Sequence, residues 1–182
     1  SEGDLQDLLK SEKYDGFNVT IPYKEKIIKY CDEISNDCRR IGAVNTVVKN
    51  AEGKYIGYNT DYFGFRYLLE KSDIDVAGRR CVILGSGGAS KTVSVVLQDL
   101  GAKEILEVSR TGEINYENIK ECGDAEIIVN STPVGMFPNN MKSLINLDDF
   151  PGCIGVVDLI YNPNRTKLIL DAMERGIPAV SG

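Results

Sequence analysis

The sequence contains no histidine, no surplus of basic residues and no long apolar run. Its 21 lysines and arginines are outnumbered by 27 aspartates and glutamates, and the net charge of −6 excludes a broad basic surface for nucleic acid. No apolar run approaches the ~20 residues that a membrane span needs. We therefore expect neither nucleic acid nor a membrane as a partner, and any bound anion must be held by local features.

The cysteines are odd in number and none is closely paired with another: Cys31, Cys38, Cys81, Cys122 and Cys153. Zinc sites use close cysteine pairs, often with histidine, so this spacing predicts no metal site. We interpret the cysteines as reduced thiols of a cytoplasmic protein. The polar residues 1–4 also lack the apolar segment of a secretory signal peptide.

At 182 residues the chain can hold one ordinary domain or two small ones. Residues 1–72 are predicted to form a small α/β domain. Its expected helices lie near 5–9, 23–31, 33–41 and 61–71, and its expected strands at 17–21, 44–49 and 55–58. The turn composition between the last two strands predicts a hairpin.

Residues 73–182 are predicted to form a second α/β domain, because short apolar runs alternate with helical patterns. The expected strands lie at 81–84, 104–109, 126–130, 154–159 and 177–180, and the expected helices at 91–100, 116–122 and 166–175. Such alternation is typical of a Rossmann-like, doubly wound parallel sheet with right-handed crossovers.

A glycine-rich turn, Gly85-Ser86-Gly87-Gly88-Ala89-Ser90, follows the first strand of this domain and opens a helix. That context is typical of a dinucleotide-binding fingerprint, in which backbone N–H groups and the helix dipole hold a pyrophosphate. The sixth position is serine rather than glycine or alanine, but serine is small enough for packing there. A plain glycine turn is the alternative.

Arg110 stands 25 residues after Gly85, at the tip of the next expected strand. An acidic residue at that tip would bind the ribose of NAD, whereas an arginine accommodates the 2′-phosphate of NADP. Glu107 is acidic but lies two residues inside the strand, where we expect it to project into packing or solvent. The pattern therefore favours NADP over NAD, with an exposed surface arginine as the alternative.

Lys24 is predicted to lie in the first turn of the helix at 23–31. The helix dipole disfavours a cation there, so its position indicates a functional residue rather than a solvated surface lysine. Asp61 is expected at the N-cap of the helix at 61–71. A structural role as a cap and a functional role for Asp61 are compatible.

Two polar segments follow strands of the second domain, at residues 130–136 and 158–163. Their first residues are expected at the carboxyl edge of the sheet, where ligands bind. The first segment is expected to contact a cofactor, and Tyr161 in the second can offer its phenol to a substrate carboxylate. Ordinary βα loops are the alternative for both.

Six segments, in order, resemble the shikimate dehydrogenase family: residues 18–24, 43–46, 58–61, 85–90, 130–136 and 158–163. The resemblance covers almost the whole chain and is far more specific than the glycine turn alone. It implies a substrate-binding domain at 1–72 and an NADP-binding domain at 73–182. It also implies NADPH-dependent reduction of 3-dehydroshikimate to shikimate, in the biosynthesis of chorismate and aromatic amino acids.

The resemblance further implies a role for individual residues. Lys24 and Asp61 would be the catalytic pair and would contact the substrate. Thr20 and Asn45 would bind substrate hydroxyls together with Asp61, and Tyr161 would lie near the substrate carboxylate. The implied NADP(H)-binding residues are Gly85, Ser86, Gly87, Gly88, Ala89, Ser109, Arg110, Thr111, Thr132 and Met136, with 109–111 around the 2′-phosphate and the last two beside the nicotinamide.

The family usually begins with a strand carrying a Ser-x-Ser motif and closes with a helix carrying a substrate-binding glutamine. Neither is present here, so we expect a fragment, and the implied activity is that of the complete protein. A quinate/shikimate dehydrogenase that uses NAD is one alternative, against which Arg110 argues. A noncatalytic ligand-binding module is another. The expected partner is a small-molecule substrate, and the expected assembly is a monomer or homodimer.

Overall fold

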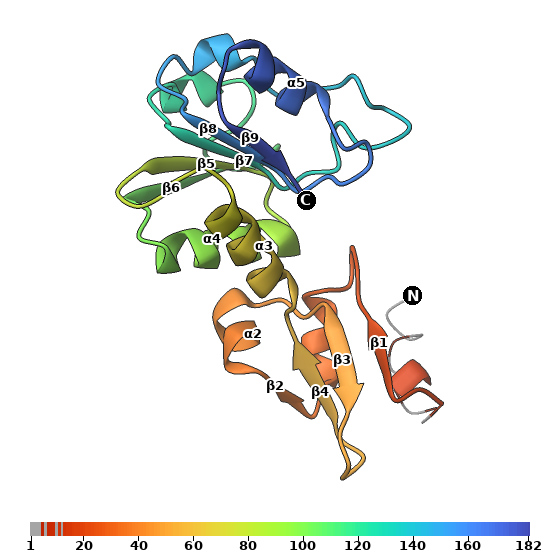
Figure 1. Cartoon of the computed structure of the whole chain (residues 1–182). Helices are drawn as coiled ribbons and strands as arrows, with labels where there is room; N and C mark the ends of the chain where they lie inside the picture. The colour runs from red at the N-terminus through yellow and green to blue at the C-terminus, as the bar shows by residue number, and fades with distance from the viewer. Residues whose placement is uncertain (1–4, 6, 10, 12) are drawn as a thin grey trace. The chain divides into compact units, whose positions relative to one another are not determined.

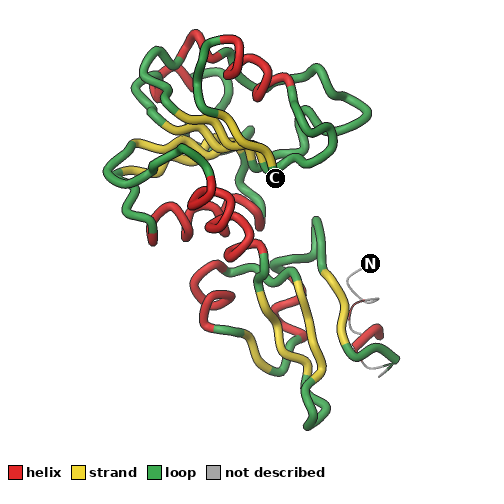
Figure 2. The backbone as a smooth tube through the Cα atoms, in the orientation of Figure 1, coloured by secondary structure: helices red, strands yellow, loops and turns green. Residues whose placement is uncertain are grey.

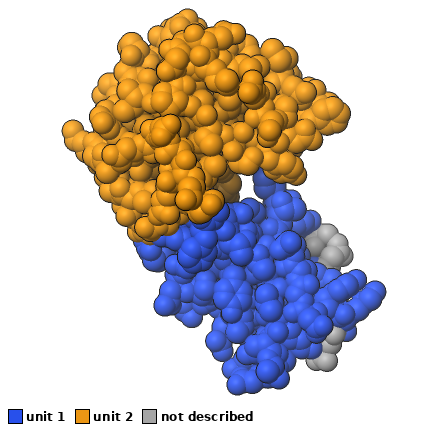
Figure 3. All heavy atoms as spheres, viewed as in Figure 1, with its two compact units in different colours: residues 1–64 blue, residues 65–182 orange. Residues whose placement is uncertain are grey.

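The computed structural model describes residues 5, 7–9, 11 and 13–182. The chain divides into two compact units, Ser1–Gly64 and Phe65–Gly182 (Figure 3). The boundary between them falls inside helix α3, Asp61–Lys71, and so precedes the domain boundary that the sequence predicts after residue 72. The polar start at residues 1–4 lies outside the described residues.

The first unit contains a four-stranded sheet (Figures 1 and 2). Its strands, in spatial order, are β1 (Gly16–Asn18), β3 (Thr46–Lys49), β4 (Tyr55–Tyr58) and β2 (Glu33–Ile34). β3 and β4 form the predicted hairpin, which is confirmed. The side chain of Asn50 closes its turn, because Oδ1 accepts from the N–H groups of Glu52 and Lys54 at 3.0 and 2.9 Å.

The α-helix predicted at 23–31 is wrong in type and length. The structure has a short 3₁₀ helix, η1, at Lys26–Tyr30. The carbonyl of Lys24 accepts from the N–H of Val44 at 2.8 Å and is therefore engaged outside the helix. The N–H of Ile28 bonds instead to the carbonyl of Glu25 at 3.4 Å, which is the 3₁₀ pattern.

The helix predicted at 33–41 begins later, as α2, Asn36–Ile41. Glu33 and Ile34 instead form β2, which pairs in parallel with β4. Ser35 caps α2, because its side chain accepts from the N–H of Cys38 at 3.3 Å. Gly42 ends the helix in the left-handed conformation, with φ 72°.

The second unit contains a five-stranded sheet in which every pairing is parallel. Its strands, in spatial order, are β6 (Glu104–Val108), β5 (Arg80–Leu84), β7 (Ile127–Asn130), β8 (Gly155–Asp158) and β9 (Ala179–Ser181). The predicted parallel α/β fold is confirmed. The central strands are buried on both faces, as their continuous apolar runs indicate.

Figure 1 shows helices α4 (Gly88–Asp99) and α5 (Lys167–Glu174) against opposite faces of this sheet. Val82 and Leu84 of β5 share a buried cluster with Leu168 and Ile169 of α5. Alternate residues of the same strand point to the other face. The second unit therefore has the layered arrangement of a doubly wound fold.

The helix predicted at 116–122 is also wrong in type and length. It is a one-turn 3₁₀ helix, η2, at Ile119–Cys122; a second, η3, lies at Leu147–Asp149. The side chain of Asn118 accepts from the N–H of Asn115 at 2.7 Å, and that of Asn115 accepts from the N–H of Glu117 at 2.8 Å. These local bonds replace the first helical turn.

The strand order of the second unit reverses at β5, which lies between β6 and β7. The chain passes from β5 to β6 on one side and then returns across β5 to β7 on the other. In doubly wound sheets, ligands bind at the carboxyl ends of the strands at this reversal. The turn after β5 and the loop after β7 therefore form the expected ligand-binding edge of the second unit.

Within the described ranges, no helix combines the length and the apolar character needed to cross a membrane. The same part of the chain holds no group of three or more histidine, cysteine, aspartate or glutamate side chains that could bind a metal ion.

All five cysteines are free, and all but Cys31 are buried. Burial raises the pKa of the Cys31 thiol to about 11 and that of the Cys81 thiol to about 12. Burial also raises the pKa of the other three thiols. We predict that iodoacetamide modifies the native protein only slowly at pH 8, since roughly one Cys31 thiol in a thousand is ionised there and fewer of Cys81. Cys31 should react first. Mass spectrometry of native and guanidinium-unfolded samples checks this, and rapid native labelling of Cys81 would contradict it.

Candidate active site

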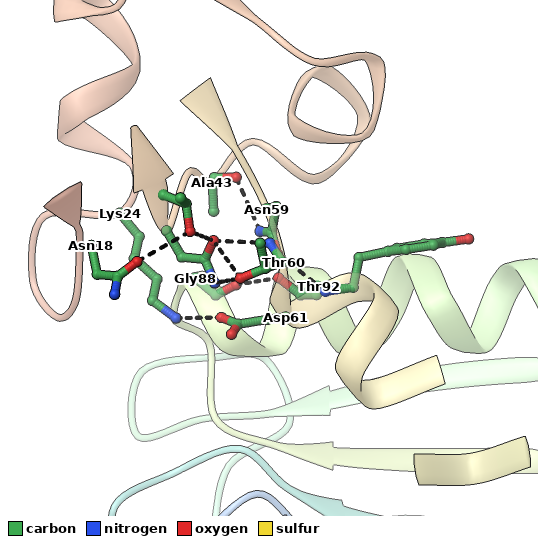
Figure 4. A network of polar contacts seen from close by, with 11 residues as sticks. Asn18, Lys24, Ala43, Asn59, Thr60, Asp61, Gly88 and Thr92 are labelled. Carbon is green, nitrogen blue, oxygen red and sulfur yellow. Dashed lines mark hydrogen bonds and ion pairs between the residues drawn. The ribbon is translucent and has the colours of Figure 1, made fainter. Parts of the chain in front are cut away.

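Lys24 and Asp61 form an ion pair within the first unit, with Nζ and Oδ2 2.6 Å apart (Figure 4). Lys24 lies in the turn between β1 and η1, and Asp61 is the first residue of α3. The Lys24 side chain is 16% exposed and that of Asp61 43% exposed. The structure thus brings together the two residues that the family resemblance names as a pair, and the distance is that of a charge-assisted hydrogen bond.

Main-chain bonds fix the position of Lys24. Its carbonyl accepts from the N–H of Val44, and one residue further on the carbonyl of Asn45 accepts from the N–H of Val19 at 2.7 Å. Lys24 therefore precedes η1, and the prediction that it lies in the first turn of a helix is wrong. Its low exposure and its pairing with Asp61 distinguish it from a solvated surface lysine.

Asn59 supplies the cap that the sequence assigned to Asp61. Its Oδ1 accepts from the N–H of Tyr62 at 3.2 Å, and its Nδ2 donates to the carbonyl of Ala43 at 3.1 Å. The side chain is only 3% exposed. The expectation that Asp61 is the N-cap is therefore wrong, and its carboxylate pairs with Lys24 instead. The signal for Asn59 was its place two residues before the helix, where asparagine is a frequent cap.

Asn45 lies at the centre of a chain of polar contacts that includes Thr60, the residue before Asp61. Its Oδ1 accepts from the N–H of Thr60 at 2.9 Å and from the hydroxyl of Thr46 at 3.0 Å. Its Nδ2 donates to Thr60 Oγ1 at 3.0 Å. The amide is therefore held in one orientation. Thr20, also predicted as a substrate ligand, is exposed in the turn after β1, where its carbonyl accepts from the N–H of Tyr23.

The second unit carries the remaining predicted site residues, and most of them lie after the carboxyl ends of its strands. The turn after β5 consists of Gly85, Ser86 and Gly87, and α4 begins with Gly88 and Ala89. The segment after β6 contains Ser109, Arg110 and Thr111. The loop after β7 contains Thr132 and Met136, and the loop after β8 contains Tyr161.

The glycine turn and the loop after β7 lie in contact at the reversal of the sheet. Gly85 has φ +114°, and a Cβ there would lie 2.7 Å from Ser131 Oγ and 3.1 Å from Thr132 Cγ2. At Gly87, in contrast, an added Cβ would meet no atom within 4 Å. The backbone before α4 is therefore open, and open N–H groups at a helix N-terminus fit a pyrophosphate.

Ser90 fills the sixth position of the fingerprint and is fully buried. Its hydroxyl donates to the carbonyl of Gly87 at 2.7 Å and lies 3.2 Å from Glu107 Oε2. Serine thus fits the packing there and also fixes the turn. Glu107 is exposed to solvent as expected, and in addition its carboxylate lies beside the start of α4.

Arg110 and Thr111 are exposed after β6, while Ser109 is buried. Burial raises the pKa of Tyr116, and the positive charge of Arg110 opposes that rise. Within the described part of the chain, Arg110 forms no ion pair. An exposed, unpaired guanidinium at this strand tip has the chemistry of a phosphate ligand.

The loops after β7 and β8 are joined, because the N–H of Phe137 donates to the carbonyl of Asn162 at 3.1 Å. Thr132 Oγ1 donates to Asn130 Oδ1 at 2.7 Å, which fixes the first turn of the loop after β7. Met136 and Tyr161 are 43% and 75% exposed. Their side chains are accessible to a ligand at this edge of the sheet.

Residues 2–47 match the family model of the shikimate dehydrogenase substrate binding domain. The whole chain aligns at 36% identity with the shikimate dehydrogenase (NADP(+)) of Clostridium perfringens strain SM101 and covers 71% of it. The fold is similar to the crystal structure of shikimate dehydrogenase 1 from Peptoclostridium difficile, with a TM-score of 0.90 and 38% identity over 100% of this chain and 70% of that one.

A second solved structure is that of shikimate 5-dehydrogenase from Thermus thermophilus in complex with NADP(H) and shikimate. Its TM-score is 0.80, with 31% identity over 98% of this chain and 70% of that one. The chain spans 66 to 71% of the length of the curated relatives that it matches.

The contrast between Gly85 and Gly87 generates a prediction about stability. Gly85→Ala should lower the free energy of unfolding by about 1–3 kcal/mol, because a positive φ and a contact with Ser131 both oppose a side chain. Gly87→Ala, the matched control with φ −95°, should change it by less than about 1 kcal/mol. Urea unfolding of both variants checks this, and equal losses would contradict it.

Proposed function

The chain belongs to the shikimate dehydrogenase family, and on this premise we propose that it contains the catalytic pair and the nucleotide site of an NADP-dependent shikimate dehydrogenase. The reaction is the reduction of 3-dehydroshikimate to shikimate by NADPH, in the route to chorismate and aromatic amino acids. The observation that carries the proposal is the 2.6 Å bond between Lys24 and Asp61, which holds an ammonium ready to act as a proton donor.

Reduction of a ketone needs a hydride on carbon and a proton on oxygen. Bound NADPH supplies the hydride. Lys24 donates the proton to the ketone oxygen as negative charge develops there, and it accepts that proton in the reverse reaction. One N–H of the ammonium is directed to Asp61, and the other two remain for the substrate, because the described residues offer Nζ no second acceptor.

Asp61 has two roles in this proposal. Its Oδ2 orients the ammonium of Lys24, and its partly exposed carboxylate accepts from a substrate hydroxyl next to the reacting carbon. Asn45 donates to a further hydroxyl, since one N–H of its amide is engaged by Thr60 and the other is not. We assign a third hydroxyl to the exposed side chain of Thr20, and the substrate carboxylate to Tyr161 of the second unit.

The NADP site uses the carboxyl edge of the second unit. We assign the pyrophosphate to the backbone of residues 85–89, where the open position at Gly87 supports close approach. Ser109, Arg110 and Thr111 surround the 2′-phosphate, and Thr132 and Met136 line the nicotinamide side. The solved structure of the Thermus thermophilus relative is a complex with NADP(H) and shikimate, which supports NADP(H) as the cofactor.

We further propose that the protein acts in the cytoplasm as a monomer or homodimer, on a small-molecule substrate and without nucleic acid or membrane partners. The free thiols support the cytoplasmic location, and the net charge of −6 argues against a nucleic acid partner. Absorbance assays of the complete protein with shikimate or quinate, each with NADP or NAD, test the activity. Turnover should be most efficient with shikimate and NADP. Efficient use of quinate and NAD, or binding without turnover, would contradict the proposal.

Lys24→Ala should lower kcat by about 10²–10⁴-fold, which is the usual contribution of a positioned general acid. The dissociation constant of NADPH should stay nearly unchanged, because Lys24 acts on the substrate. Lys26→Ala is the matched control, since Lys26 is an exposed lysine two residues away in η1. Steady-state kinetics and NADPH titration check the prediction, and an unchanged kcat would remove Lys24 from the mechanism.

Arg110→Ala should weaken NADPH binding by about 10- to 100-fold, the value of a lost hydrogen bond between charged groups. NADH binding should change little, because NADH has no 2′-phosphate. Arg110→Lys keeps the positive charge but loses the planar guanidinium, which can donate two parallel hydrogen bonds to a phosphate. Its affinity for NADPH should therefore lie between those of the wild type and the alanine variant. Titration of each variant with both nucleotides measures this, and an equal effect on NADPH and NADH would be the opposing result.

A further inference from the structure

Asp158 is a fully buried carboxylate at the end of β8, with 0% exposure. Carboxylates are almost never fully buried unless they are paired or satisfied by hydrogen bonds. It lies in the second unit and takes no part in the steps proposed above. The proposed site therefore does not explain why a carboxylate is buried at this position.

Three donors satisfy Asp158. The hydroxyl of Thr166 donates to Oδ2 at 2.7 Å, and the N–H of Ile160 and Nδ2 of Asn130 donate to Oδ1 at 3.0 and 3.1 Å. Burial raises the pKa of Asp158, and the three hydrogen bonds oppose that rise. The donors come from three segments: the end of β7, the start of the loop after β8, and the residue before α5.

The carboxylate decides which way the amide of Asn130 faces. An ionised carboxylate only accepts hydrogen bonds, so Asn130 must present Nδ2 to it. Oδ1 of Asn130 then faces the next loop, where it accepts from both the N–H and the hydroxyl of Thr132 at 3.0 and 2.7 Å. Nδ2 also donates to the carbonyl of Val134 at 3.3 Å. The fold of residues 130–134 thus follows from the acceptor character of Asp158.

Thr166 links Asp158 to the start of α5. Its hydroxyl donates its single proton to Asp158, and the same oxygen accepts from the N–H of Ile169 at 3.3 Å and caps the helix. Gly135, at φ +102°, packs here as well, since a Cβ on it would lie 3.5 Å from the Cβ of Thr166. The first residues of the loop after β7 are therefore held at both Asn130 and Gly135, since Asn130 hydrogen-bonds to Asp158 and Gly135 lies beside Thr166, which does so too.

We propose that Asp158 is a positioning residue for the dehydrogenase reaction, which sets the loops bearing Thr132, Met136 and Tyr161 in the geometry needed for turnover. It acts through Asn130, Ile160 and Thr166 and touches neither substrate nor nucleotide. This inference rests on the proposed function, because that function places Thr132 and Met136 beside the nicotinamide. Misplacement of reacting groups by about 1 Å can lower a rate by ~10²-fold.

Asp158→Asn tests the inference with little change in volume. The new amide has one acceptor oxygen, so it turns an N–H either toward Asn130, where it opposes a donor, or toward Thr166, whose hydroxyl must then accept that bond and can no longer donate. Hydrogen exchange measured by mass spectrometry should show the amides of Thr132 and Val134, or that of Ile169 in α5, exchanging at least about tenfold faster, with β5 unchanged. Unchanged exchange at all three amides in the folded variant would overturn the proposal, and this readout needs no activity.

Kinetics of the complete protein provide the second readout. In Asp158→Asn, kcat at saturating substrates should fall at least about tenfold while the dissociation constant of NADPH changes less than about threefold. The isotope effect with deuterated NADPH should increase, because hydride transfer becomes more rate-limiting. A merely structural role predicts a lower Tm with unchanged kcat per folded molecule, and that result would refute the inference.

Thr166 supplies a milder pair of variants in case Asp158→Asn does not fold. Thr166→Val removes one donor to Asp158 and should show the same loss of kcat in smaller degree, while Thr166→Ser keeps the hydroxyl and should behave as wild type. Equal kcat in both would count against Asp158. Absence of turnover in the wild-type protein would contradict the proposed function instead, and the exchange at Thr132, Val134 and Ile169 would still decide whether Asp158 organises these segments.

Discussion

The bond between Lys24 and Asp61 depends on other hydrogen bonds, which fix the backbone of both residues. Asn59 holds the carbonyl of Ala43, and the next residue, Val44, donates its N–H to the carbonyl of Lys24. Asn59 also caps the helix on which Asp61 is the first residue. One set of hydrogen bonds, centred on Asn59, therefore positions both Lys24 and Asp61. The distance between the ammonium and the carboxylate is set by the fold of the first unit.

In the second unit, residues far apart in the sequence are brought together by the parallel sheet. The carboxyl ends of all its strands lie at the same edge. The close approach of Gly85 to Ser131 joins the loops on either side of the order reversal. Asp61 and Asp158 differ in exposure and in role. Asp61 is partly exposed, as a residue that contacts a substrate must be. Asp158 is fully buried and acts only through the residues that hydrogen-bond to it.

The sequence predicts the parallel fold well, because continuous apolar strands and the turn at 85–90 carry strong local signals. It also predicts β4 and the hairpin. It fails at 23–31 and 116–122, where the contact of Lys24 with Val44 and the side-chain turns at Asn115 and Asn118 override helical periodicity. The helix argument for Lys24 was incorrect, whereas the family resemblance named it together with Asp61. Local patterns could not find that pair, because the two residues lie 37 positions apart.

The most direct test of the central claim is a crystal structure of the complete protein with shikimate and NADP⁺ bound. The account predicts that the hydroxyl to be oxidised lies within about 3 Å of Lys24 Nζ, with Asp61 still bonded to that ammonium. A substrate bound away from Lys24, or an Asp61 carboxylate turned from the ammonium in the complex, would contradict it.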